Sequence, residues 1–263
     1  MECRLCHQDK EKLRDSHIVP KMFYNAIKRN SPTGIMREVN NPNKGVQDGV
    51  KLPFLCKDCE ELFSKYETYF SNNIYTEICQ NTGIINIDSR RDEYFYFMLS
   101  VAWRVAMYVM ETDNPSFSED EKKLVYATLA EWREWLLYEK MDKIREVQHF
   151  LIPTRDLNFF ASIPMRISDN VAIDFKTFDK ENEFSYAFTF VQVPYFILLS
   201  TIWGKTSSMK QFRLGKKIKN RDSVLPKNIT NLLHFLHYDK YFQAYDAMSD
   251  KQREMIEKRV LNK

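Results

Sequence analysis

Glycine and proline are scarce in this chain, which has six glycines and nine prolines among 263 residues. No segment is low in complexity, and no internal repeat of fixed period occurs. Together these absences argue against disorder over the whole chain. The hydrophobic fraction of 44% and the aromatic fraction of 14% can build a substantial core at this length. We therefore expect a compact globular protein with one large domain or two smaller ones.

Neither an export signal nor a membrane span is expected. The N-terminal segment MECRLCHQDK carries charges and cysteines where a secretory signal would have an apolar core. The most apolar segment, Tyr94–Met110, is about three residues shorter than a typical span of about twenty, and Arg104 lies in its middle. We predict a buried helix at this segment, a cytoplasmic location and no membrane partner.

The net charge of +3 is too small to indicate a nucleic-acid partner by itself. The distribution of charge is more informative, because the segment 205–227 contains eight basic residues and a single acid, Asp222. Such a segment is either a phosphate-contacting surface or a solvated basic loop. The residues that we expect to contact nucleic acid are Lys216, Lys217, Lys219 and Arg221.

The pattern of elements predicts an α+β fold with a small N-terminal module at residues 1–75 and a larger body at residues 76–263. The sequence before Lys57 is rich in turn-forming residues, so we expect no long helix there. The segment 57–70 has apolar residues at three- and four-residue spacing, which predicts an amphipathic helix.

The body is predicted to consist of helices, then strands, then helices. Helices are expected over about residues 91–140, and the second of them opens with a capping box of Ser118 and Glu121. The region from about 147 to 203 is rich in β-forming runs, namely HFLIP, NFFASIP, FSYAFTFVQV and YFILLSTIW. C-terminal helices are expected over about 227–260, with a break near residues 248–250.

Two pairs of cysteines share the CxxC spacing, Cys3 with Cys6 and Cys56 with Cys59. In a reducing compartment such pairs are metal ligands or redox groups more often than disulfides. A thioredoxin-like dithiol is disfavoured because no βαβ pattern surrounds either pair. Two CxxC turns complete a tetrahedral zinc site, and four cysteine ligands leave no open position for chemistry. We predict a structural zinc ion that fastens the intervening loop to the helix beginning near Cys59.

The segment DSHIVP lies in this loop and contains His17. A histidine beside a divalent metal can activate water for attack on a phosphodiester. The order of the first CxxC, His-Ile-Val-Pro and Leu-Cys-x-x-Cys resembles the HNH, or ββα-metal, nucleases over about a quarter of the chain, residues 3–70. The resemblance implies that His17 is the general base and ends the first strand, that residues 49–55 form the second strand, and that 57–70 form the helix.

The chain departs from the family at the catalytic metal ligands. Ser16 stands where the family often has an acid or a histidine before its catalytic histidine. The middle Asn of the family has no counterpart: Lys51 or Leu52 falls near its place, and Asp48 is the nearest residue able to brace the loop. On the helix, acids replace the final His or Asn, and carboxylates suit Mg²⁺ or Mn²⁺. The candidate ligands are Glu60, Glu67 and Asp15, with Glu61 as an alternative one position away.

The sequence thus predicts a metal-dependent endonuclease with structural zinc and catalytic Mg²⁺ or Mn²⁺. DNA is favoured over RNA by the resemblance, which also extends to stand-alone bacterial HNH proteins suspected of roles in phage defence. Two alternatives remain open. In the first, the chain is a zinc-knuckle nucleic-acid-binding or adaptor protein without catalysis. In the second, the body is a sensor or homo-oligomerisation platform that restrains a nuclease through a regulatory partner.

Overall fold

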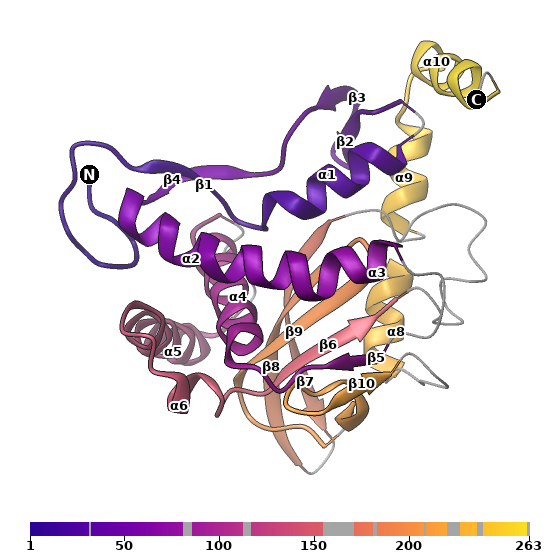
Figure 1. Cartoon of the computed structure of the whole chain (residues 1–263). Coiled ribbons are helices and arrows are strands. Elements are labelled where there is room, and N and C mark those ends of the chain that lie inside the picture. The colour runs from indigo at the N-terminus through magenta and orange to yellow at the C-terminus, as the bar shows by residue number, and fades with distance from the viewer. Residues whose placement is uncertain are drawn as a thin grey trace.

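The computed structural model describes residues 1–31, 33–80, 86–112, 117–154, 171–180, 183–207, 209–219, 227–235 and 239–261. The chain has a mixed α+β architecture (Figure 1). Strands and a helix from the N-terminal part lie along one side of helix α2, and a four-stranded sheet lies on its other side (Figure 1).

The N-terminal part contains two antiparallel strand pairs, β1 with β4 and β2 with β3. Its elements are β1 (Arg14–His17), α1 (Lys21–Asn30), β2 (Met36–Glu38), β3 (Asn41–Val46), β4 (Lys51–Leu55) and α2 (Lys57–Phe70). The strand β1 ends at His17, and α2 has the bounds of the predicted helix. The second predicted strand is shorter than expected, because β4 begins at Lys51 rather than near Gly49.

Helix α1 has ten residues and lies in the region where we expected no long helix, and the turn-rich sequence there does not predict it. Pro20 directly precedes the helix with φ of −51°, and a proline at the start of a helix sacrifices no helical hydrogen bond. Phe23, Tyr24 and Ala26 are buried, and the Phe23 ring makes an edge contact with Tyr75 at 5.0 Å between centroids. Contacts with residues distant in sequence therefore stabilise a helix that the local turn signals obscured.

The central helices match the predicted pattern. After α2 the chain continues through a π-helical turn, and the following elements are η1 (Ser71–Tyr75), α3 (Thr76–Gln80), β5 (Asn86–Asp88), α4 (Asp92–Thr112), α5 (Glu119–Leu137) and α6 (Met141–Ile144). The predicted capping box opens α5, since the Ser118 hydroxyl accepts from the Glu121 N–H and the Glu121 carboxylate accepts from the Ser118 N–H.

Helix α4 is buried between α2 and the sheet, as predicted for the apolar segment 94–110. The rings of Phe70 and Phe97 stack at 4.0 Å between centroids and join α2 to α4. Arg104, in the middle of α4, is also buried, with 1% of its surface exposed. Among the described residues, none of the helices combines the length and the apolar character needed to cross a bilayer.

The main sheet is antiparallel throughout, with the strand order β6-β9-β8-β7. Its strands are β6 (His149–Pro153), β7 (Ala172–Lys180), β8 (Glu183–Val193) and β9 (Phe196–Trp203). Three predicted β-runs correspond to β6, β8 and β9. The fourth run, NFFASIP, lies outside the described residues, and β7 was not among the predicted runs.

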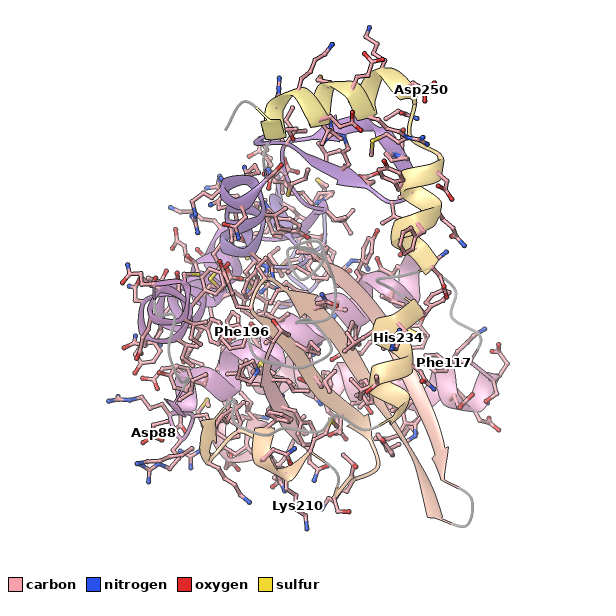
Figure 2. All side chains as sticks on the ribbon, turned by 90° about the vertical axis from the view of Figure 1, so that its right-hand side faces the viewer. Asp88, Phe117, Phe196, Lys210, His234 and Asp250 are labelled. Carbon is pink, nitrogen blue, oxygen red and sulfur yellow. The ribbon has the colours of Figure 1, made fainter. Side chains whose placement is uncertain are left out.

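The C-terminal elements return to the N-terminal part of the chain. They are η2 (Lys210–Phe212), β10 (Lys217–Lys219), α8 (Lys227–His234), α9 (Lys240–Asp246) and α10 (Asp250–Leu261), with the predicted break before Asp250. Figure 2 shows these helices rising from the sheet near His234 to Asp250. The Asn43 side chain in β3 donates to the Ala247 carbonyl at 3.0 Å and accepts from the Ser249 N–H at 2.8 Å.

One cluster of buried side chains extends from Cys3 to Leu233, so the N-terminal elements and the body share a core. The division of the chain at residue 75 stays a prediction. Strand β1 packs against α2, and α2 packs against α4, so these contacts connect the end of β1 to the body.

His149 is a buried titratable group in this core. Its Nδ1 lies 2.7 Å from the Ser200 hydroxyl, and burial lowers the pKa of His149 from 6.5 to about 3. Between these two pH values the unfolded chain binds a proton that the folded chain excludes. The free energy of unfolding is therefore expected to fall as the pH drops below 6.5, by up to about 1.4 kcal/mol per pH unit.

Chemical denaturation between pH 7 and pH 5 tests this expectation. In His149→Asn, which retains a hydrogen-bonding atom near Nδ1, this decrease should be lost whatever the absolute stability of the variant. The matched control is His234→Asn, at an exposed position of α8, and it should keep the decrease. An unchanged pH dependence in His149→Asn would contradict the assignment.

Candidate functional site

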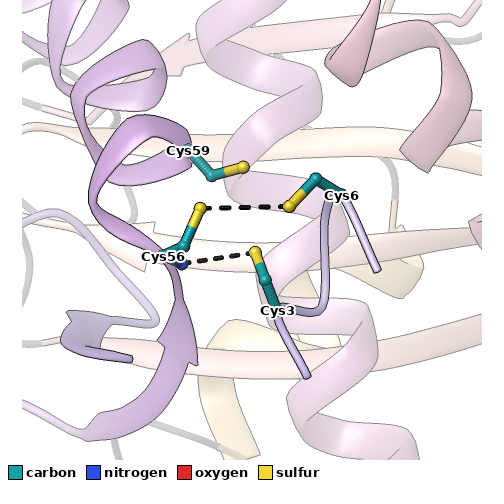
Figure 3. A group of neighbouring side chains, drawn as sticks. All are labelled: Cys3, Cys6, Cys56 and Cys59. Atoms are coloured by element: carbon teal, nitrogen blue, oxygen red, sulfur yellow. Dashed lines mark hydrogen bonds between the residues drawn. The ribbon is translucent and has the colours of Figure 1, made fainter. Parts of the chain in front are cut away.

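Four cysteines from two separate chain segments meet at the start of α2 (Figure 3). Cys3 and Cys6 precede β1, Cys56 is the N-cap residue of α2, and Cys59 lies in its first turn. Their Sγ atoms all lie within 4.8 Å of one another. The Sγ atoms of Cys6 and Cys56 are 3.9 Å apart, close to the roughly 3.8 Å between two sulfurs that are each about 2.3 Å from a tetrahedral zinc. The cluster can therefore hold a zinc ion, as predicted.

Backbone hydrogen bonds shape both cysteine turns. In the first turn, the His7 N–H donates to the Cys3 carbonyl at 2.9 Å, and His7 adopts a left-handed conformation with φ of 56°. Between the turns, the Cys56 N–H donates to Cys3 Sγ at 3.2 Å. The His7 ring contacts Glu2 rather than the cluster. The ligand set is therefore the four cysteines alone.

Electrostatics within the cluster favour a bound cation. Burial raises the pKa of the Cys59 thiol, and its proximity to Cys56 and Cys3 raises that pKa further. Four thiolates at this separation would repel one another strongly in a buried site. A divalent ion removes this penalty by binding all four sulfurs in their deprotonated form.

We expect the purified protein to contain one equivalent of zinc that Cys56→Ser reduces well below one. A zinc ion at the cluster would close a loop of 49 residues between the two cysteine turns, and loss of this closure should lower the free energy of unfolding by about 4 kcal/mol. Elemental analysis and chemical denaturation measure the two effects. Cys79→Ser is the matched control and should keep the metal. A full equivalent of zinc in Cys56→Ser would be inconsistent with this site.

His17 lies at the last position of β1, opposite Lys51 in β4. Its Nε2 lies 2.8 Å from Oδ1 of Asp48, and Oδ2 of Asp48 lies 2.5 Å from the Lys51 ammonium. Burial raises the pKa of Asp48, but hydrogen bonds from Lys51, His17 and the Gly49 N–H outweigh it and hold this pKa well below its usual range. An ionised Asp48 only accepts hydrogen bonds, so Nε2 of His17 is the donor in this contact, and in a neutral imidazole the lone pair is then on Nδ1.

The loop that carries Asp48 is held by a close approach to Tyr24. A Cβ atom at Gly49 would lie 1.9 Å from Cζ of the Tyr24 ring, so only glycine fits at this position. The Tyr24 ring is in turn 6.2 Å from the His17 ring between centroids. The imidazole, its carboxylate and the supporting loop thus form one packed unit.

The predicted metal ligands Glu60 and Glu67 form hydrogen bonds with residues other than His17 and Asp48. The Ser16 hydroxyl donates to Glu60 Oε2 at 2.5 Å, while Arg104 Nη2 donates to Glu67 Oε1 at 2.6 Å. Asp15 is exposed. Among the described residues, only the four cysteines bring three or more metal-ligating atoms within 4.8 Å, so Glu60, Glu67 and Asp15 form no such group.

Sequence reasoning missed two features of this region. The sequence indicates Asp48 only as a brace for the loop, because its contact with His17 depends on the register of β1 against β4. In the sequence Arg104 argues against a membrane span, and a charge in an apolar helix also signals a buried partner. That partner, Glu67, was the second choice among the helix acids for a metal ligand.

Two of the predicted nucleic-acid-binding residues, Lys216 and Lys217, lie far from His17. Lys216 and Lys217 are exposed, and Lys217 pairs with Asp88 across β10 and β5. Figure 1 places β10 at the end of the molecule remote from β1. The Lys219 side chain and Arg221 lie outside the described part of the chain. The structure thus does not bring these lysines and His17 together.

Comparison of the chain with models of protein families, with curated proteins and with solved structures finds no match.

Proposed function

We propose that this chain is a metal-dependent endonuclease of the HNH type, which hydrolyses phosphodiester bonds of nucleic acid, preferably DNA. The observation that carries the proposal is the contact between His17 and Asp48 at the end of β1. The strand β1 pairs with β4, and α2 follows β4 directly. The cysteine cluster fastens the start of α2 to the segment before β1. This order of elements is the one that the resemblance to ββα-metal nucleases implies.

In this proposal His17 is the general base. With Nε2 bound to Asp48, Nδ1 is the nitrogen that would accept a proton from the attacking water. The Asp48 carboxylate orients the imidazole and stabilises the imidazolium ion that forms, as the carboxylate of a catalytic triad does. Lys51 keeps Asp48 ionised and fixes its second oxygen.

Glu60 is the favoured ligand for a catalytic Mg²⁺ or Mn²⁺. Its Oε2 accepts from Ser16, and a carboxylate has a second oxygen to offer. Glu67 is less suited, because the charge of Arg104 already balances its carboxylate. Mg²⁺ sites often use only one or two carboxylates together with substrate phosphates. When bound, the ion would neutralise charge on the scissile phosphate.

Cleavage of supercoiled plasmid by the zinc-loaded protein tests the proposal. We expect cleavage with Mg²⁺ or Mn²⁺, none with EDTA, and a loss of about 10² to 10⁴-fold in rate for His17→Ala, the range for removal of a general base. Asp48→Asn should slow the reaction as well, while His234→Ala serves as a control at an exposed histidine. Absence of cleavage with either metal, while one equivalent of zinc is bound, would overturn the proposal.

The second candidate function is a zinc-knuckle nucleic-acid-binding or adaptor protein without catalysis. One observation favours it: Glu60 and Glu67 are both engaged by donors of the protein itself, Ser16 and Arg104. In that case the wild type should bind DNA without cleaving it, and His17→Ala should bind with the same affinity. A role in phage defence rests on the resemblance alone and would follow from the nuclease activity.

A further inference from the structure

Arg104 connects three elements of the protein from within the core. Its side chain is 2% exposed, in the middle of α4. The guanidinium donates to the Ser100 carbonyl at 3.2 Å, to the His17 carbonyl at 2.9 Å and to the Glu67 carboxylate at 2.6 Å. Its central carbon lies 5.2 Å from the centroid of the Phe63 ring. The side chain thus links α4 to the end of β1 and to α2.

A buried guanidinium restricts the positions of all of its partners. Arginine cannot lose its charge in a protein, so burial is tolerated only when its N–H groups find acceptors. Here the acceptors come from both the strand and the helix next to the candidate site. Any displacement of the end of β1 from α4 would leave the charge underpaired. The planar guanidinium group also fixes the directions of its hydrogen bonds as well as their lengths, whereas an ammonium group does not fix the directions.

We propose that Arg104 is a positioning residue for His17, through which the body sets the conformation of the strand end that carries the base. Arg104 donates a hydrogen bond to the backbone carbonyl of His17, while Asp48 forms a hydrogen bond with the His17 ring. Glu67 then serves as the counter-ion of Arg104 and not as a metal ligand. The catalytic consequence rests on the proposed nuclease function, but the structural coupling of Arg104 to His17 does not.

Arg104→Lys is the decisive variant, because it keeps the positive charge and loses the planar fork. Arg133→Lys is the matched control: Arg133 in α5 also donates to a carbonyl of the N-terminal part, that of Leu5, at 2.9 Å. Two readouts are needed, the NMR signal of the His17 imidazole at one fixed pH, assigned with His17→Gln, and kcat and KM for plasmid cleavage. Zinc content monitors the cysteine cluster.

We expect Arg104→Lys to shift the His17 imidazole signal and to lower kcat by about 10 to 100-fold, the effect of displacing a catalytic group by roughly 1 Å. KM and zinc content should stay near those of the wild type, and Arg133→Lys should change neither readout. A folded, zinc-loaded Arg104→Lys with an unchanged His17 signal and unchanged kcat would overturn the inference.

Two further outcomes are also decisive. If Arg104→Lys does not fold, Glu67→Gln takes its place, since it keeps a hydrogen-bond acceptor and removes only the counter-charge. It should shift the same His17 signal, and an unchanged signal would overturn the inference. If the wild type cleaves nothing, the nuclease function fails, while the His17 signal in the variants still decides whether Arg104 positions this residue.

Discussion

The cysteine cluster is the constraint on which the N-terminal part depends. It joins the segment before β1 to the first turn of α2, and thereby defines both ends of a loop that contains α1 and the β2–β3 hairpin. Because β1 and β4 are short, with four and five residues, their pairing alone would hold the loop weakly. A hydrogen bond from the body reinforces the pairing, as Arg104 donates to the His17 carbonyl at the end of β1. A zinc ion at the cluster and this tertiary contact would therefore act on the same strand pair.

The candidate site is organised by a series of contacts between charged and polar groups that come from different parts of the chain. Lys51 neutralises Asp48, Asp48 holds His17, and Arg104 holds both the His17 carbonyl and Glu67. Each charged group has an opposite charge within hydrogen-bonding distance. These contacts favour one arrangement of the end of β1, because displacing it would remove an acceptor from the buried Arg104 guanidinium.

Much of the fold could be predicted from local sequence signals. The CxxC spacing, the amphipathic period of residues 57–70, the capping box at Ser118 and the β-forming run HFLIP are properties of neighbouring residues, and each corresponds to an observed element. What escaped prediction depends on long-range packing. Helix α1 is stabilised by contacts with Tyr75, and the partners of His17 and Arg104 follow from strand register and helix docking. Neither the register of paired strands nor the docking of helices can be predicted from local sequence signals, because both depend on residues that are distant in the sequence.

Helix α2 connects the cysteine cluster to the centre of the hydrophobic core. The helix begins at the cysteine cluster and ends at Phe70, whose ring stacks on Phe97 of α4 in the centre of the molecule. A ligand that binds only the folded chain stabilises it, and by the same thermodynamic linkage the stability of the fold contributes to the affinity for the ligand. The affinity of the cluster for a zinc ion would accordingly depend on the stability of the whole core. A peptide that contained only the four cysteines would bind the ion less tightly than the intact protein, and a substitution at Phe97 would loosen a metal bound at the opposite end of α2.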